Sequence, residues 1–275
     1  MPSHHPALPR RHLLRLASTW PLAALVGCAS PWPAVPAGPG SSSARNRLVD
    51  AATTHGLAAW RGLRDINARF SSAWPTVPMS PMSPAQPGPA TGPLELRLLP
   101  GLARSAPAPT SGLLGHQHRL QADAHRLLLL GPLAVVDQAS VVNWGPPETL
   151  DGQRCDQLHL DLAPGLGGGA PDKLSLYIDR ERGLLRRLRV SLQALPGQSA
   201  QSAVAEMDCF DHLLLHGVLW PRRFQAPAGG LLTAAAPQTW RLTGLDVNRG
   251  YAADALAGAA FSGAAAAPAH ALPNG

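Results

Sequence analysis

Two histidines and an aspartate stand close together in the stretch "DHLLLH" of the C-terminal third. Asp211 precedes His212 directly, and His216 follows four residues after His212. On a helix, this spacing places both imidazoles on one face, as a zinc site requires. However, Gly217 comes next, "HGVLWP" is typical of a hairpin corner, and the spacing implies no third ligand. We therefore predict no metal site. A metal-binding protein stays an alternative that needs another ligand beside His212 and His216.

Four further histidines are distributed over separate segments. His116 and His118 would share one face of a strand, whereas His125 and His159 belong to other segments. A lone histidine on the polar face of a sheet is usually solvated, so the spacing of these residues predicts no ligand set.

The other reactive groups lack the surroundings that catalysis requires. The chain has no Gly-X-Ser-X-Gly turn, and Ser175 fills an outward strand position. Asp208 with Asp211, and Asp156 with Asp161, form carboxylate pairs in sequence, but nothing indicates that they face one another. The glycines of "GLGGGAPD" lack the strand-to-helix setting that phosphate binding needs. We predict no catalytic residue, no cofactor and no enzyme; an envelope enzyme stays an alternative that needs titratable groups in a cleft.

The first 27 residues are arranged as a secretory signal. Arg10, Arg11 and Arg15 precede a short apolar run that ends at Gly27. This run is too short and too interrupted to span about 30 Å of hydrocarbon as a helix.

The stretch Leu25-Val26-Gly27-Cys28 resembles the lipobox of bacterial lipoproteins. In that family the cysteine is alkylated by a diacylglyceryl group, becomes the first residue after cleavage, and is usually acylated on its amine. The resemblance implies a signal peptide over 1–27 and a lipid anchor, such as palmitate, at Cys28. Ala29 stands where an aspartate would indicate inner-membrane retention, which favours an outer-membrane lipoprotein facing the periplasm. An ordinary signal peptide with an accidental cysteine is the alternative.

Beyond Cys28 the chain has only two cysteines, Cys155 and Cys209, in separate strand-like segments. In an oxidising periplasm they form a possible disulfide, although a free buried cysteine is also common.

The charge of the chain argues against nucleic acid as a partner. Residues 1–27 carry three of the 23 basic residues, so 20 basic residues face 17 acidic ones and the mature net charge is +3. The arginines are scattered, with few aromatic residues between them. Arg186, Arg187 and Arg189 are the most concentrated. They suggest either a rim for lipid head groups or an acidic partner protein, or a solvated strand face that discourages edge pairing.

The N-terminal half mixes a helix, strands and proline-rich segments. Residues 28–43 form a Pro/Gly/Ser-rich tether, and Ser43 is placed to cap a helix that starts at Ala44 and ends near His55. Strands are expected at 66–71 and 94–99, on either side of a proline-rich insertion at 75–93, and 100–112 is expected to be a loop. The segment 117–130 is compatible with two strands or with a helix through its leucines.

In the C-terminal half, apolar and polar residues alternate more clearly. "CDQLHLDL", "KLSLYI", "LLRRLRVSLQ", "AVAEMDCF", "GVLWPRRFQA" and "TWRLTGLDVN" read as short strands joined by turn residues, with Arg186 breaking the alternation of the third. We therefore predict a mainly β (α+β) fold. A long antiparallel sheet curls into an unclosed half-barrel over residues 44–265, an N-terminal helix and loops cover its concave face, and 266–275 form a disordered tail.

The order of these elements is similar to that of the lipoprotein carrier and receptor proteins of the outer-membrane lipoprotein pathway (the Lol-type superfamily) and of related mycobacterial lipid-binding lipoproteins. "LYIDRERGLLRRLRV" followed by "EMDCFDHLLLHGVLWPRRF" resembles their recurring strand–turn–strand pair. The insertion at 75–93 and the shortage of aromatic residues depart from that pattern.

These observations lead to a non-catalytic, lipid-anchored envelope protein that binds or transfers the acyl chain of a lipid or lipoprotein. The expected cavity lining comes from inward strand positions: Leu158, Leu160, Leu176, Ile178, Leu188, Val190 and Trp240. The same residues suit a structural or assembly lipoprotein with a filled core, in which the outer surface would carry the function. An envelope protein is a possible further partner.

Overall fold

The structure is a computed structural model, and it describes residues 40–72, 92–106, 112–139, 141–191, 204–227 and 238–273. The predicted signal peptide, Cys28 and most of the tether lie outside these residues, as does the greater part of the expected insertion at 75–93. The described residues all fall within one structural unit, residues 31–275.

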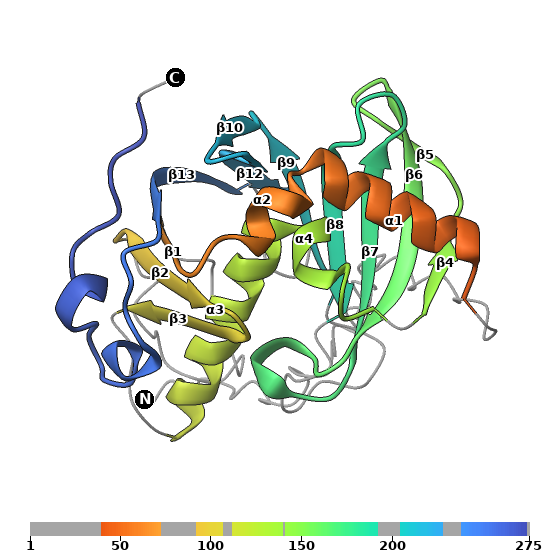
Figure 1. The fold of residues 1–275 in the computed structure, drawn as a ribbon. Coiled ribbons are helices and arrows are strands. Elements are labelled where there is room, and N and C mark those ends of the chain that lie inside the picture. The colour runs from red at the N-terminus through yellow and green to blue at the C-terminus, as the bar shows by residue number, and fades with distance from the viewer. Residues whose placement is uncertain are drawn as a thin grey trace, which may run out of the picture. The chain divides into compact units, whose positions relative to one another are not determined.

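An antiparallel sheet of eleven strands dominates this unit (Figure 1). Ten strands follow the order β3-β2-β1-β13-β12-β9-β8-β7-β6-β4, β5 also pairs with β6, and β10 and β11 form a separate hairpin. The two ends of this order, β3 and β4, do not pair with each other, so the prediction of a mainly β fold with an unclosed sheet is confirmed. The strands are β1 Ile66–Phe70, β2 Leu94–Leu99, β3 Leu102–Ala106, β4 Val142–Trp144, β5 Glu148–Leu150, β6 Gln153–Leu162, β7 Asp172–Asp179, β8 Leu185–Ser191, β9 Val204–Phe210, β10 Leu213–Leu215, β11 Val218–Trp220, β12 Arg223–Ala226 and β13 Gln238–Val247.

The alternation of leucines gives the sheet one apolar face, which we call the inner face. Leu158 of β6 pairs with Leu176 of β7, which pairs with Leu188 of β8, which pairs with Met207 of β9. All four side chains are at most 1% exposed. Because side chains on a strand alternate between faces, this single row sets the register of four strands.

A β-bulge explains the arginine that breaks the sequence pattern of β8. Tyr177 pairs with Arg187, but Ile178 pairs with Leu185, so Arg186 is an extra residue on β8. A bulge of this kind allows the residues on both sides of it to keep their faces.

The ambiguous leucine-rich segment is a helix, α3 (Gly112–Leu130), followed by the short helix α4 (Pro132–Val135). Four consecutive leucines, Leu127 to Leu130, are all buried. Consecutive residues of a helix point in different directions, so this end of α3 is surrounded by protein. No helix within the described ranges is long and apolar enough to cross a membrane.

The expected N-terminal helix is α1 (Ser42–Thr54), and it begins slightly earlier than predicted. The hydroxyl of Ser41, not that of Ser43, accepts a hydrogen bond from the backbone N–H of Ala44 at the start of the helix. Leu48, Ala51 and Ala52 form its buried side, as the sequence indicated. The helix α2 (Leu57–Arg61) follows directly, with Gly56 between them in a left-handed conformation.

Two predicted irregular segments are ordered, and both predictions were wrong. Residues 102–106, expected in a loop, form β3 at the edge of the sheet. The expected disordered tail is held against β13 over residues 266–273, because the backbone N–H groups of Leu245 and Leu272 donate to the carbonyl groups of His270 and Thr243. A sequence rich in alanine and proline carries no periodic signal for such a contact.

Two arginines form hydrogen bonds with the backbone of the C-terminal segment, which contains the short helices η2 (Ala253–Leu256) and η3 (Gly263–Ala265). The guanidinium of Arg97, which is fully buried, donates to the carbonyl groups of Ala265 and Ala267 at 2.9 and 2.7 Å. The guanidinium of Arg249 donates to the carbonyl of Pro268 at 2.6 Å and to the carboxylate of Asp246. Charged groups that are buried in this way need several partners, and here the backbone of the segment supplies them.

The inner face predicts the stability of single variants. Leu176→Ala should lower the free energy of unfolding by about 2–5 kcal/mol, because it removes a fully buried side chain and leaves a void. Leu214→Ala on β10 should change it by less than about 0.5 kcal/mol, because Leu214 is 65% exposed. Denaturant unfolding of both variants tests this, and equal losses would show that the inner face is not the core.

Candidate functional site

The inner face carries all seven residues that the sequence suggested as a cavity lining. They lie on β6, β7, β8 and β13, belong to one hydrophobic cluster, and are at most 5% exposed: Leu158, Leu160, Leu176, Ile178, Leu188, Val190 and Trp240. The structure therefore brings the seven residues together in one buried cluster. It also packs them against side chains from the covering helices.

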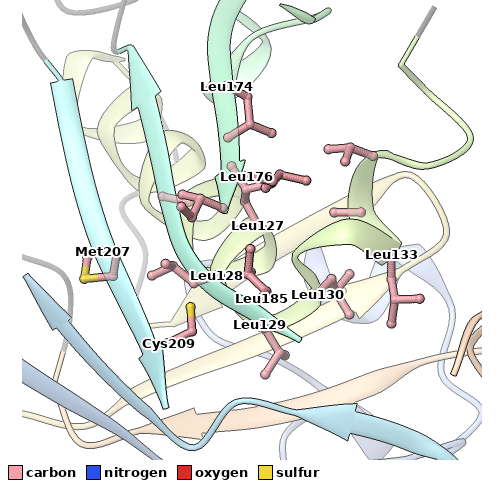
Figure 2. Packing of buried hydrophobic residues seen from close by; sticks show 14 of the residues in the cluster. Leu127, Leu128, Leu129, Leu130, Leu133, Leu174, Leu176, Leu185, Met207 and Cys209 are labelled. Atoms are coloured by element: carbon pink, nitrogen blue, oxygen red, sulfur yellow. The ribbon is translucent and has the colours of Figure 1, made fainter. Parts of the chain in front are cut away.

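Leucines from α3 and α4 supply that packing. Figure 2 shows Leu127, Leu128, Leu130 and Leu133 among the inner-face residues of β7, β8 and β9. Each of these leucines is at most 4% exposed. The inner face is thus occupied by the helices that cover it, and α3 contributes more of this cover than the N-terminal helix that the sequence emphasised.

A groove opens where α2 meets the ends of β1 and β2, and its volume is about 170 Å³. Ile66 and Leu98 at its floor are members of the inner-face cluster, and Trp60 and Leu63 pack against that cluster. The groove is therefore lined in part by residues of the apolar core. Arg61 and Arg64 add two cationic side chains to its lining.

Sequence reasoning did not identify this groove. The signal is present in "LAAWRGLRD", where a tryptophan and two arginines cluster at the junction of a helix and a strand. Only the pairing of β1 with β2 places Leu98 opposite Ile66 and completes the apolar floor.

One ion pair connects two of the helices beside the groove. The guanidinium of Arg61, at the end of α2, lies 2.7 Å from the carboxylate of Asp137, just after α4. Their side chains are 57% and 62% exposed. Exposed pairs of this kind contribute about 0–1 kcal/mol, so the connection between α2 and α4 is weak.

A buried histidine of α3 faces the interior. His125 is 1% exposed, its ring lies 4.9 Å from the ring of Phe70, and its Nδ1 lies 2.8 Å from the carbonyl oxygen of Gln121. Burial lowers the pKa of His125 to about 4, and the hydrogen bond to Gln121 opposes that shift only partly. The imidazole is therefore neutral at pH 7.

Two other histidines meet where the C-terminal end of α1 contacts the start of β8. The rings of His55 and His212 are 5.7 Å apart, edge to face. His55 Nε2 accepts a hydrogen bond from the backbone N–H of Leu185, so it has no lone pair left for a metal. Burial, His55 and Arg186 together lower the pKa of His212 to about 4.

The structure does not bring the sequence-suggested histidines together as a metal site. His212 and His216 lie at either end of the β10–β11 hairpin, and His159 is on β6. Among the described residues, no three His, Cys, Asp or Glu side chains are grouped so that they could hold a metal ion.

The arginines of β8 do not form an open rim. Arg187 contacts Asp208 at 2.5 Å and Glu206 at 3.1 Å across the strand pair, and Arg189 lies 3.9 Å from Glu206. The side chains of Arg187 and Arg189 are only 18% and 13% exposed. The solvated or partner-binding face expected here is thus a cross-strand network of ion pairs on the outer face of the sheet.

The carboxylates that are paired in sequence have separate cationic partners. Asp208 contacts Arg187, whereas Asp211 contacts Arg223. Likewise, Asp161 binds Lys173, and Asp156 accepts hydrogen bonds from Arg47 and Arg180. Neither pair has the shared, desolvated position of an acid–base dyad.

A serine and a histidine do lie within hydrogen-bond distance on the outer face. His159 Nδ1 is 2.7 Å from the hydroxyl oxygen of Ser175. Ser175 is completely buried, so its oxygen is not accessible to a substrate. This contact links β6 to β7 and provides no usable nucleophile.

The possible disulfide does not form. Cys155 and Cys209 are free and buried. They lie on β6 and β9, which β7 and β8 separate, so roughly 14 Å lies between their strands. That separation is about twice the limit for bridging two Cα atoms. Sequence spacing could not reveal the two intervening strands.

The sequence matches no family model and no curated protein. Among solved structures, the fold is similar to a putative outer membrane lipoprotein-sorting protein domain from Vibrio parahaemolyticus, with 11% identity, coverage of 78% of this chain and 97% of that chain, and a TM-score of 0.40. A LolA superfamily protein from Nitrosomonas europaea is 9% identical over 78% of this chain and 96% of that chain, with a TM-score of 0.41. LprF from Mycobacterium bovis is 16% identical over 56% and 89%, with a TM-score of 0.29.

The buried histidines predict that stability falls with acidification. The unfolded chain takes up protons near pH 6.5, whereas His125 in the folded chain stays neutral down to about pH 4. This contribution to stability is therefore complete above pH 6.5 and is lost between pH 6.5 and 4, by roughly 3 kcal/mol for one such histidine. His125→Gln should flatten the dependence of the unfolding free energy on pH in that range. Leu214→Ala, which alters an exposed side chain that does not titrate, should leave the dependence unchanged, and equal slopes in all three proteins would contradict the prediction.

Proposed function

We propose that this protein is a non-catalytic, lipid-anchored protein of the cell envelope that binds the acyl chain of a lipid or lipoprotein inside its curled sheet. The observation that carries the proposal is the groove beside α2, because its floor is the same apolar surface that forms the interior. An acyl chain that enters there meets hydrocarbon side chains from its first methylene onward. The resemblance of residues 44–263 to lipoprotein carriers implies the same class of ligand.

Binding requires part of the helical cover to move, because the inner face is filled in the structure. The helices beside the groove are suited to such movement. α2 and α4 have five and four residues, and helices so short have little stability of their own. The Arg61–Asp137 pair that joins them is exposed and weak. Each methylene that an acyl chain buries contributes about 0.8 kcal/mol, so a few methylenes offset the loss of that pair.

A structural or assembly lipoprotein is the second candidate. The observation that favours it is the packing of the seven inner-face residues, all at most 5% exposed, against α3 and α4. A protein with this role would keep its interior closed and would act through its surface. The two candidates differ in whether the interior ever holds a ligand.

Bound acyl chains distinguish the two candidates. The full chain with Cys28→Ser removes the proposed anchor, so that any acyl species in the purified protein is a ligand. We expect mass spectrometry after mild purification to find acyl chains in molar proportion to the protein. If the purified protein contains no bound acyl chain and also fails to take up a fluorescent fatty acid, the carrier function is contradicted and the structural role is favoured.

The proposed anchor has a separate test. In cells given radiolabelled palmitate, the unaltered chain should carry label and sediment with membranes, whereas Cys28→Ser should be unlabelled and released from them. The reason is that two or three acyl chains hold a protein on a membrane durably. Equal label in both proteins would contradict acylation at Cys28.

A further inference from the structure

The groove beside α2 has a charge that the apolar interior lacks. Arg61 and Arg64 are both exposed, and Arg64 has no ion-pair partner for its guanidinium among the described residues. Trp60 directly precedes Arg61 and Leu63 directly precedes Arg64, and both apolar side chains are half-buried against the core. The groove therefore presents cations at its rim and hydrocarbon at its floor.

Asp65, the one carboxylate in the groove lining, hydrogen bonds to backbone groups and is not paired with Arg61 or Arg64. Asp65 is 2% exposed, and its oxygen atoms accept hydrogen bonds from the backbone N–H groups of Arg249 and Gly250 at 2.8 and 2.7 Å. These bonds tie the start of β1 to the segment after β13. The carboxylate is thus committed to the fold, and Arg64 is left to act on whatever occupies the groove.

We infer that this groove binds the anionic head of a single-chain amphiphile, with carboxylate or phosphate oxygens at Arg64 and Arg61 and the first methylenes against Trp60, Leu63 and Leu98. The inference rests on the proposed function and specifies its ligand class. Guanidinium groups are suited to both anions, because their planar donors match the oxygens of carboxylate and phosphate. Trp60 adds an amphipathic ring at the boundary between head and chain, where tryptophan is commonly found.

Arg61 connects recognition of the head to opening of the cover. The head group competes with Asp137 for the guanidinium of Arg61. When Arg61 turns to the ligand, α2 and the end of α4 lose the ion pair that joins them. The anionic head therefore loosens the cover at the place where its own chain must enter, and a neutral head does not.

The experiment uses the full chain with Cys28→Ser and four ligands with the same chain length: dodecanoate, dodecyl phosphate, monolauroylglycerol and dodecylamine. Calorimetric titration should show both anions binding about tenfold more tightly than the neutral ligand, and the cation binding weakest. Tight binding of only one anion also supports the proposal and identifies the head group as carboxylate or phosphate. Raising the salt concentration should reduce the preference for anions.

Three variants complete the test. Arg64→Gln should lower anion affinity several-fold and leave monolauroylglycerol binding unchanged. Asp137→Asn, which releases Arg61, should raise anion affinity. Arg182→Gln removes an exposed arginine from the turn between β7 and β8 and should have no effect.

The possible failures are distinguishable. If the anions and the neutral ligand bind equally and Arg64→Gln has no effect, the head-group site is rejected while acyl binding stands. If none of the four ligands binds, the proposed function itself is rejected, and the inference falls with it.

Discussion

The structure depends on the need to bury one face of a very long sheet. Most of the eleven strands contribute apolar side chains to the inner face, and the only other strands among the described residues form the short β10–β11 hairpin. An open apolar surface of this size is not stable in water, so other parts of the chain must cover it. α1, α3 and α4 provide that cover, and the identity of their buried residues follows from it. Leu127 to Leu130 are four consecutive apolar residues, and all four positions at this end of α3 are buried.

This constraint also explains why the same residues suit a carrier and a filled core. A sheet covered by helices from its own chain is stable without a ligand, and its interior is closed. The two roles differ in how firmly the helices that cover the inner face are held in place. α3 is long and deeply packed, whereas α2 and α4 are short and are joined by an exposed ion pair. The groove lies beside these short helices, where movement costs least.

Alternation and turn residues made the sheet predictable from sequence. The strands around Leu158, Leu176 and Leu188 follow a period of two residues, and the turn glycines separate them clearly. β3 and the C-terminal segment were missed because their contacts are made by backbone groups and distant arginines, which leave no local periodicity. The sequence could not exclude a disulfide between Cys155 and Cys209 for a similar reason. The number of strands that separate the two cysteines depends on the order of strands in the sheet, which sequence spacing does not give. One part of the candidate site, its apolar lining, could be predicted from the alternation of residues in the strands. The groove could not, because it forms only where α2, β1 and β2 meet in the fold.

The pairing of β1 with β13 places nearly the whole chain between two neighbouring strands. Asn67 and Asp246, which are hydrogen bonded across this pair, are 179 positions apart. The middle of the sheet therefore cannot be completed until almost all of the polypeptide has been synthesised, and contacts of such long range make folding slow.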